Sequence, residues 1–340
     1  MNFLRKILFP FAILYGLITW FRNFLFDLGV LKSTSFPFPV IAVGNLSVGG
    51  TGKTPQIEYL IRLLSADYRI AALSRGYKRK SEGFVLADAN ASAETLGDEP
   101  FQFYQKFPNI QVAVDADRTS GIKQLLALNP KPEVILLDDA FQHRNVKAGF
   151  YILLTAYNDL YTDDFMLPTG NLRESRSGAS RANCIIVTKC PPDLSESAQE
   201  KIWKKLNPEF HQKLYFSFID YDNNVFSEHT SLKVSEIKAS EKVLVAGIAK
   251  PNSFFERLQS GNDMQLQFPD HHHFSEKEIL EITAKANGRM IVTTEKDYVR
   301  LKGKIEKKQL FYLPIQTGFL ADRENFDKFV LSYIHKTQKI

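Results

Sequence analysis

The sequence predicts an α/β fold in which helices flank a mostly parallel sheet, with a second, smaller α/β lobe and a separate helix at the N-terminus. Short apolar, β-branched runs recur along the chain, and segments long enough for a helix separate them. This alternation is typical of parallel sheets with crossover helices. The runs of the first lobe are Val40–Val43, Ile70–Leu73, Ile110–Val114, Val134–Leu137, Tyr151–Leu154 and Ile185–Val187, and those grouped with the second are Leu214–Ile219, Val243–Ala246, Met290–Thr293 and Leu310–Leu313.

The first 30 residues predict a helix at a membrane surface. Residues 7–21 are nearly all apolar or aromatic, and Arg5, Lys6 and Arg22 flank them. The stretch is short for a membrane span, and no small-residue cleavage site of a signal peptide follows it. Its aromatic C-terminal part resembles an interfacial belt. A helix in the membrane interface therefore fits best, and a buried core helix is the alternative.

A glycine-rich loop follows the first apolar run and predicts a phosphate-binding site. Small residues let backbone N–H groups point at an anion, and a helix that starts there adds its positive end. Lys53 would reach the β and γ oxygens of a nucleotide, and the Thr54 hydroxyl would bind Mg²⁺. Ser47 replaces the first glycine of the usual pattern. The predicted ATP-binding loop of this P-loop NTPase-type core is Ser47, Val48, Gly49, Gly50, Thr51, Gly52, Lys53 and Thr54.

Two carboxylates end another predicted strand of the same lobe. Asp138 and Asp139 follow the apolar run 134–137 directly. In P-loop enzymes an acid at this place supports Mg²⁺, directly or through water. At least one of the two is therefore predicted to be functional, and the sequence leaves open which one touches the metal.

Two further loops carry candidate catalytic groups. Asp98 and Glu99 stand before a predicted helix, and alone they read as a capping sequence. Transfer to an alcohol requires a base, and a carboxylate held by a histidine would meet this need. The segment 268–274 contains three of the seven histidines. A base partner is preferred there to a metal site, because adjacent side chains diverge.

The predicted domains are residues 1–30, the N-terminal helix; residues 31–220, the P-loop core; and residues 221–340, a C-terminal α/β lobe. The boundary rests on the polar stretch 221–233, which is predicted to be a linker.

Composition limits the class of protein. With 44% hydrophobic and 24% charged residues the chain is globular, and its net charge of +5 favours an anionic surface or substrate without requiring nucleic acid. Cys184 and Cys190 predict reduced core residues rather than a disulfide framework.

Taken together, these motifs resemble the tetraacyldisaccharide 4′-kinases of lipid A biosynthesis over nearly the whole chain. Ala140 is a departure, because the family pattern has glycine there. The shared motifs are Gly44–Pro55, Ser74–Tyr77, Gly97–Pro100, Asp138–His143, Gly170–Glu174, Asp270–His272 and Thr293–Asp297.

The resemblance implies ATP- and Mg²⁺-dependent phosphorylation of the 4′-hydroxyl of a tetraacylated glucosamine disaccharide 1-phosphate. It implies an enzyme that is peripheral or monotopic at the cytoplasmic face of the inner membrane, with a lipid substrate and no nucleic-acid or protein partner. It also implies two α/β/α lobes joined by a short β linker, with the nucleotide in the cleft between them.

The resemblance further assigns roles to individual residues. Lys53 and the loop amides would hold the phosphates, and Asp98 would be the base with His271 as its partner. His271 is preferred to His272 because it directly follows Asp270. The remaining predicted catalytic residues are Asp138 and Asp139; the metal ligands are Thr54, Asp139, Glu99 and Glu174; and the substrate-binding residues are Arg75, Tyr77, Asn45, His143 and Arg173.

Two alternatives remain at this stage. Another small-molecule P-loop kinase or ligase would share the loop but would not need an aromatic N-terminal helix. A membrane-tethered nucleotide switch would favour GTP, but Cys190 and Pro191 follow Thr188-Lys189 where a guanine-reading pattern needs aspartate.

Overall fold

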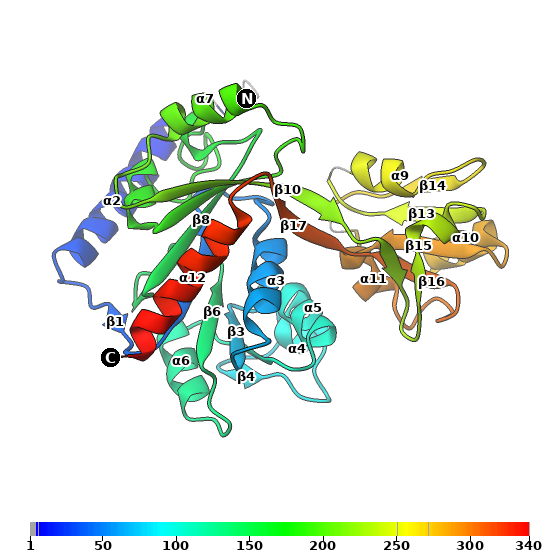
Figure 1. Ribbon diagram of the computed structural model, residues 1–340, viewed down its shortest axis with the longest axis horizontal. Helices are drawn as coiled ribbons and strands as arrows, with labels where there is room; N and C mark the ends of the chain where they lie inside the picture. Colours follow the sequence, from blue (N-terminus) through cyan, green and yellow to red (C-terminus); the bar gives the residue numbers. More distant parts are fainter. Residues whose placement is uncertain (1–4, 6, 250, 271, 340) are drawn as a thin grey trace. The chain divides into compact units, whose positions relative to one another are not determined.

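The computed structural model describes residues 5, 7–249, 251–270 and 272–339, which form two compact units (Figure 1). The first unit is Met1–Ile219 together with Thr317–Ile340, and the second is Asp220–Gln316. The chain leaves the first unit in strand β10 (Lys213–Tyr221) and returns to it in strand β17 (Ile315–Phe319).

The larger sheet has the strand order β17-β10-β9-β8-β2-β6-β3-β5-β4. Its pairs from β10 to β5 are parallel, and β4 pairs antiparallel with β5 at the edge. Its other strands are β2 (Val40–Asn45), β3 (Ile70–Ser74), β4 (Val85–Leu86), β5 (Gln111–Val114), β6 (Val134–Asp138), β8 (Phe150–Ala156) and β9 (Cys184–Thr188).

Strand β2 lies in the middle of this sheet, and all of its residues are buried. Ile41 and Val43 pack on one face, and Val40 and Ala42 pack on the other. Val43 pairs with Asp138 of β6 on one side and with Ile152 of β8 on the other. Because the strands are parallel, the loops that follow β2, β3, β5, β6 and β9 open at one edge of the sheet.

Helices cover both faces of the sheet. One face carries α3 (Lys53–Leu64), α5 (Asp98–Lys106) and α12 (Arg323–Gln338), whose Phe326, Val330 and Ile334 are fully buried (Figure 1). The opposite face carries α6 (Arg118–Leu126) and α7 (Glu196–Leu206). The remaining short elements of this unit are β1 (Thr34–Ser35), α4 (Ala93–Leu96), β7 (Val146–Lys147) and the 3₁₀ helices Tyr161–Asp163 and Arg176–Arg181.

The second unit has the strand order β12-β11-β16-β15-β13-β14, parallel from β16 to β14. Helices α8 and α9 pack on one face, and α10 and α11 pack on the other. Its elements are β11 (Asn224–Phe226), β12 (Ser231–Lys233), α8 (Val234–Ile237), β13 (Lys242–Ala246), α9 (Asn252–Leu258), β14 (Met264–Gln267), α10 (Glu276–Ala286), β15 (Met290–Thr294), α11 (Glu295–Leu301) and β16 (Leu310–Leu313).

The N-terminal helix α2 (Phe9–Asp27) has an inner and an outer side. The inner positions 12, 15, 16, 19, 22, 23 and 26 are buried or half-buried and follow a helical period. Its outer side exposes large apolar residues at positions such as Ile13, Leu17 and Phe21. By length and composition this helix could cross a membrane.

The predicted α/β class is confirmed. The run 214–219, grouped with the second set of strands although it lies within the predicted core 31–220, is part of β10 in the first sheet, where it pairs with β9. One predicted boundary is wrong. Residues 317–340, predicted to lie in the C-terminal lobe, belong to the first unit, where α12 completes the core. The predicted linker 221–233 instead forms the antiparallel pair β11 and β12.

Candidate active site

The glycine-rich loop joins β2 to α3, as predicted. Helix α3 begins at Lys53, and Gly52 precedes it with a φ of 85°. Gly49 has a φ of 117°, so both positions use backbone conformations that side chains other than glycine rarely adopt. The loop therefore meets the positive end of α3 with the geometry that an anion site requires.

Hydrogen bonds from other segments fix the backbone of this loop. The Thr188 hydroxyl donates to the Thr51 carbonyl over 2.7 Å, and Lys189 Nζ donates to the Gly50 carbonyl over 2.5 Å. The backbone N–H of Val48 donates to the Asn171 carbonyl over 2.7 Å. The conformation of the loop is thus fixed by groups at the end of β9 and in the loop that contains Asn171.

Asp139 lies among cations. Arg173 donates to both of its oxygens, over 2.8 and 3.1 Å, and Lys53 Nζ is 3.8 Å away. Arg173 also donates to the backbone and side-chain oxygens of Asn45. Burial alone would raise the pKa of Asp139, but the Arg173 hydrogen bonds and the nearby charges outweigh it and lower that pKa. Asp139 is therefore ionised and orients Lys53 and Arg173.

Asp138 has a different environment. The carboxyl is buried, Ser74 Oγ donates to Oδ2 over 3.1 Å, and Oδ1 has no hydrogen-bond partner within the described ranges. Burial, followed by the charges of Glu99 and Asp139, raises the pKa of Asp138 to about 7. A nearby cation would stabilise the ionised form of such a buried carboxyl.

Helix α5 brings a third acid to the loop. Thr54 Oγ1 donates to Glu99 Oε1 over 3.3 Å. Asp98 is exposed at the first position of the same helix. His271, its predicted partner, lies outside the described residues, so the pairing stays a prediction.

His272 has its own partner in the second unit. Its Nε2 lies 2.9 Å from Glu278 Oε1, and its ring stacks on Phe268 with the centroids 5.0 Å apart. Hydrogen bonds from Ser275, and then the one from His272, lower the pKa of Glu278 to about 2. His272 is thus tied to the start of α10, and the choice of His271 stays a prediction.

Glu174 is surrounded by protein hydrogen-bond donors. It is fully buried, and it accepts hydrogen bonds from Arg181 at 2.8 Å, Gln142 at 2.8 Å and Asn23 at 3.0 Å. Oε1 accepts from Gln142, and Oε2 accepts from Arg181 and Asn23, so these bonds tie α2 to the core. The metal role of Glu174 stays a prediction.

Arg118 is a buried cation near the acids, and the sequence did not predict it. It donates to the carbonyl of Asp115, just after β5, at 2.8 Å and to the carbonyl of Asp138, at the end of β6, at 3.1 Å. Burial lowers its pKa to about 10. Its position directly after a strand of the same edge was the available signal, but the local sequence reads as an ordinary helix start capped by Asp117.

Of the five predicted substrate-binding residues, Arg75 and Arg173 carry positive charge, whereas Asn45 and His143 are uncharged. Burial, and then the charges of Arg118 and Arg75, lower the pKa of His143, so its ring is neutral. Arg75 is exposed, and Asn45 and Arg173 are linked as described above. Tyr77 differs: its side chain projects into solvent with 76% of its surface exposed, and the Lys78 ammonium group lies over its ring.

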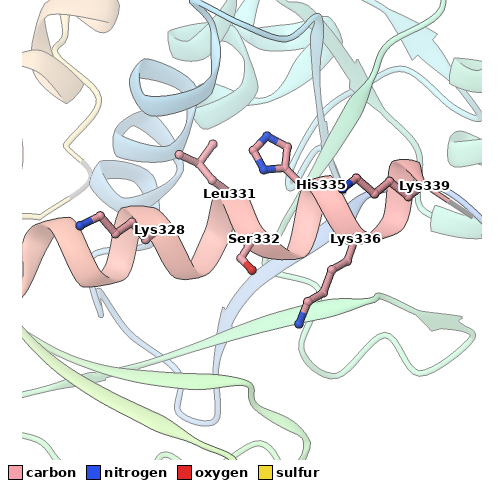
Figure 2. A pocket seen from close by; sticks show the side chains of 6 residues that line it. All are labelled: Lys328, Leu331, Ser332, His335, Lys336 and Lys339. Carbon is pink, nitrogen blue, oxygen red and sulfur yellow. The ribbon is translucent and has the colours of Figure 1, made fainter.

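Two observations concern other places where a metal or ligand could bind. Among the described residues, no group of three or more His, Cys, Asp or Glu side chains forms a metal site by itself. The pocket in Figure 2 is lined by side chains of α12 and by Lys339, which directly follows that helix, so one short segment bounds it. Neither competes with the strand-edge site. The residues of that pocket are Lys328, Leu331, Ser332, His335, Lys336 and Lys339.

A glycine loop at a helix start, with a lysine, a hydroxyl and buried acids around it, defines a P-loop phosphotransferase. The chain belongs to the LpxK family, tetraacyldisaccharide-1-P 4′-kinase, whose family model matches residues 4–335.

Similar proteins agree with this assignment. The tetraacyldisaccharide 4′-kinase of Flavobacterium johnsoniae is 68% identical over 98% of both chains. That of Bacteroides thetaiotaomicron is 44% identical over 99% of this chain and 95% of the relative. The crystal structure of the "apo" form of LpxK from Aquifex aeolicus in complex with ATP has a TM-score of 0.78 and 31% identity, and the match covers 97% of this chain and 99% of that one.

Proposed function

We propose that this protein transfers the γ-phosphoryl group of ATP to the 4′-hydroxyl of tetraacyldisaccharide 1-phosphate in lipid A biosynthesis, giving the 1,4′-bisphosphate and ADP. The observation that carries the proposal is the convergence of Lys53, Thr54, Asp138 and Glu99 around one glycine loop. Family membership supports the acceptor.

The loop and α3 supply the phosphate site. The backbone N–H groups of the loop and the start of α3 provide positive potential for the phosphates. Lys53 adds a full charge, and Asp139 at 3.8 Å holds its ammonium group in the site. In-line transfer requires positioning and charge neutralisation, which these groups provide.

The residues present fit a Mg²⁺ ion. Asp138 has an unpartnered buried oxygen among the described atoms, and Thr54 and Glu99 bring two more oxygens to the loop. Oxygen ligands completed by phosphates and water are the set that Mg²⁺ prefers. When bound, the ion would neutralise charge on the transferred phosphoryl group. Asp139 is better placed to orient Lys53 than to coordinate the ion, since cations surround it.

Protonation of Asp138 predicts how Mg²⁺ affinity changes with pH. A proton and the ion compete for the carboxylate, whose pKa is raised to about 7. Lowering the pH from 8 to 6 should therefore weaken Mg²⁺ binding to the ATP complex about tenfold. The measurement is a Mg²⁺ titration of a fluorescent ATP analogue at each pH. Asp138→Asn removes the titrating group, so its affinity should change less, and an equal change in both proteins would contradict this role.

Asp98 is proposed as the base that accepts the proton of the 4′-hydroxyl, with His271 as its partner. Its exposure at the start of α5, next to Glu99, supports access to an acceptor. Arg75 is exposed, and it lies close enough to Arg118 and His143 for its charge to lower the pKa of both. Arg75, with the uncharged His143 as a neighbour, is therefore proposed to bind the phosphorylated sugar.

The outer side of α2 is proposed to bind the cytoplasmic face of the inner membrane. Hydrogen bonds hold the inner side along much of its length, from Tyr15 to the Arg173 carbonyl at 2.9 Å and from Asn23 to Glu174 at 3.0 Å. A helix fastened lengthwise to the protein favours a monotopic attachment in the interface over a span.

Substitution on this outer side tests the attachment. Each leucine that is removed from the membrane weakens the free energy of membrane binding by about 2 kcal/mol. The double change Leu14→Glu and Leu17→Glu should therefore lower partitioning into anionic vesicles at least about a hundredfold. Vesicle co-sedimentation measures it. Trp203→Glu on α7 is the matched control, because Trp203 is also about half exposed. Unchanged partitioning of the double variant would refute the attachment.

Transfer of labelled γ-phosphate from Mg·ATP to tetraacyldisaccharide 1-phosphate in detergent micelles tests the function itself. We expect labelled lipid. Nucleotide hydrolysis without labelled lipid would overturn the proposed acceptor and would favour a nucleotide switch or a different substrate.

A further inference from the structure

Helices α3 and α5 carry facing rows of polar side chains that begin at the candidate active site. On α3 the row is Thr54, Glu58 and Arg62, which are spaced by four residues and so share one side of the helix. On α5 the row is Glu99, Gln102 and Lys106, with spacings of three and four.

Direct contacts join the two rows along their length. The first is the hydrogen bond from Thr54 to Glu99 at 3.3 Å. One turn further, Glu58 Oε1 accepts from Gln102 Nε2 at 3.0 Å, and its Oε2 accepts from Lys106 Nζ at 2.6 Å and from Arg62 Nη2 at 3.0 Å.

Glu58 is the centre of this network and is almost completely buried, with 1% of its surface exposed. A buried ion pair is weak evidence for stability, because apolar residues of similar size often stabilise a fold as well. Such pairs can, however, fix the alignment of two elements, since the paired groups meet in only one alignment. An apolar contact between α3 and α5 would permit small shifts along the helix axes.

The end of α5 that carries Asp98 and Glu99 needs such an alignment. Gly97, with a φ of 92°, is the single residue between α4 and α5, so the backbone turns there and the two helices do not form one continuous helix. Gln102 and Lys106 lie about one and two turns after Asp98. Their bonds to Glu58 therefore determine where the two acids stand relative to the phosphate loop.

We infer that Glu58 is a positioning residue that fixes the alignment of α5 against α3 and so sets Glu99 beside Thr54 for metal binding and Asp98 for proton transfer. The inference rests on the proposed function. Glu58 itself does not touch the nucleotide or the acceptor; it acts through Gln102 and Lys106.

The test compares Glu58→Gln with the wild type in two assays. Mg²⁺ titration of a fluorescent ATP analogue should show a half-saturating Mg²⁺ concentration at least fivefold higher in the variant, while analogue affinity without Mg²⁺ changes less than twofold. Phosphoryl transfer should show a kcat about tenfold lower, since a displaced base slows the chemical step.

Two further variants separate positioning from stability. Asp263→Asn breaks the fully buried pair of Asp263 with Lys242 in the second unit, 2.7 Å apart, and should lower the melting temperature without changing the Mg²⁺ constant. The double variant Glu58→Gln and Lys106→Met removes both charges of this pair. Its melting temperature should be higher than that of Glu58→Gln alone. Its Mg²⁺ constant should stay raised, because the aligning bonds are still missing.

The outcomes are distinct. A Mg²⁺ constant that returns to the wild-type value together with the melting temperature would overturn the positioning role, as would an unchanged constant in Glu58→Gln. If Glu58→Gln does not fold, the Mg²⁺ constant of the double variant is compared with that of the wild type. A wild-type protein that neither binds ATP with Mg²⁺ nor transfers phosphate would refute the proposed function instead.

Discussion

Replacing Lys53 by alanine is expected to lower the rate of phosphoryl transfer at least about a thousandfold, the largest effect of any single substitution in the site. Lys53 places its ammonium group, 14% exposed, at the start of α3 and 3.8 Å from Asp139. Its loss removes a full charge from the phosphate site and leaves Asp139 to repel the nucleotide. Single-turnover transfer of labelled γ-phosphate to the lipid measures the effect.

Lys80→Ala is the matched control for this substitution. Lys80 also pairs with an acid, Glu94, at 3.0 Å, but its side chain is 75% exposed. Such surface pairs contribute little, so activity should stay within about twofold of the wild type. If Lys53→Ala folds but its rate of phosphoryl transfer falls by less than about tenfold, Lys53 does not act on the phosphates.

Replacing Asp98 by asparagine is expected to lower kcat about a hundredfold while the KM for ATP changes less than about threefold. The substitution keeps the size of the side chain and removes its ability to accept the proton of the acceptor hydroxyl. Steady-state kinetics with ATP and lipid varied separately measure both constants. Equal losses in ATP affinity and kcat would argue against a base and for a nucleotide-binding role.

Glu94→Gln controls for the loss of a negative charge near the start of α5, because Glu94 lies in α4, before the break at Gly97. A pH–rate profile adds an independent check on the partner. If Asp98 and His271 act as a pair, His271→Ala should remove the same limb of the profile that Asp98→Asn removes. Different limbs would separate the two residues.

The sequence predicts the central strands because each is an unbroken apolar run, and a parallel strand buried on both faces needs that composition. It does not predict that β10 pairs with β9 or that α12 packs on the first sheet. Both depend on contacts with β9 and with the core of the first unit, which are distant in sequence. No local pattern encodes such contacts.

In the candidate site, too, local features are predictable from the sequence, and features that depend on distant contacts are not. The phosphate loop is predictable because its glycines, lysine and threonine act through neighbouring backbone, which a short motif contains. The surroundings of Glu174 and Arg118 could not be predicted, because they depend on burial and on partners from other segments. These partners are Arg181 and Gln142 for Glu174 and two backbone carbonyls for Arg118. A charged residue in a sequence does not reveal which groups will surround it.

The return of the chain to the first unit constrains the order in which the protein can mature during synthesis. The second unit is one continuous segment, Asp220–Gln316, whereas the first needs Thr317–Ile340. Until Phe326, Val330 and Ile334 leave the ribosome, the apolar face that they cover stays open to water and to other chains. The phosphate-binding half of the enzyme therefore finishes folding last, although its sequence is translated first.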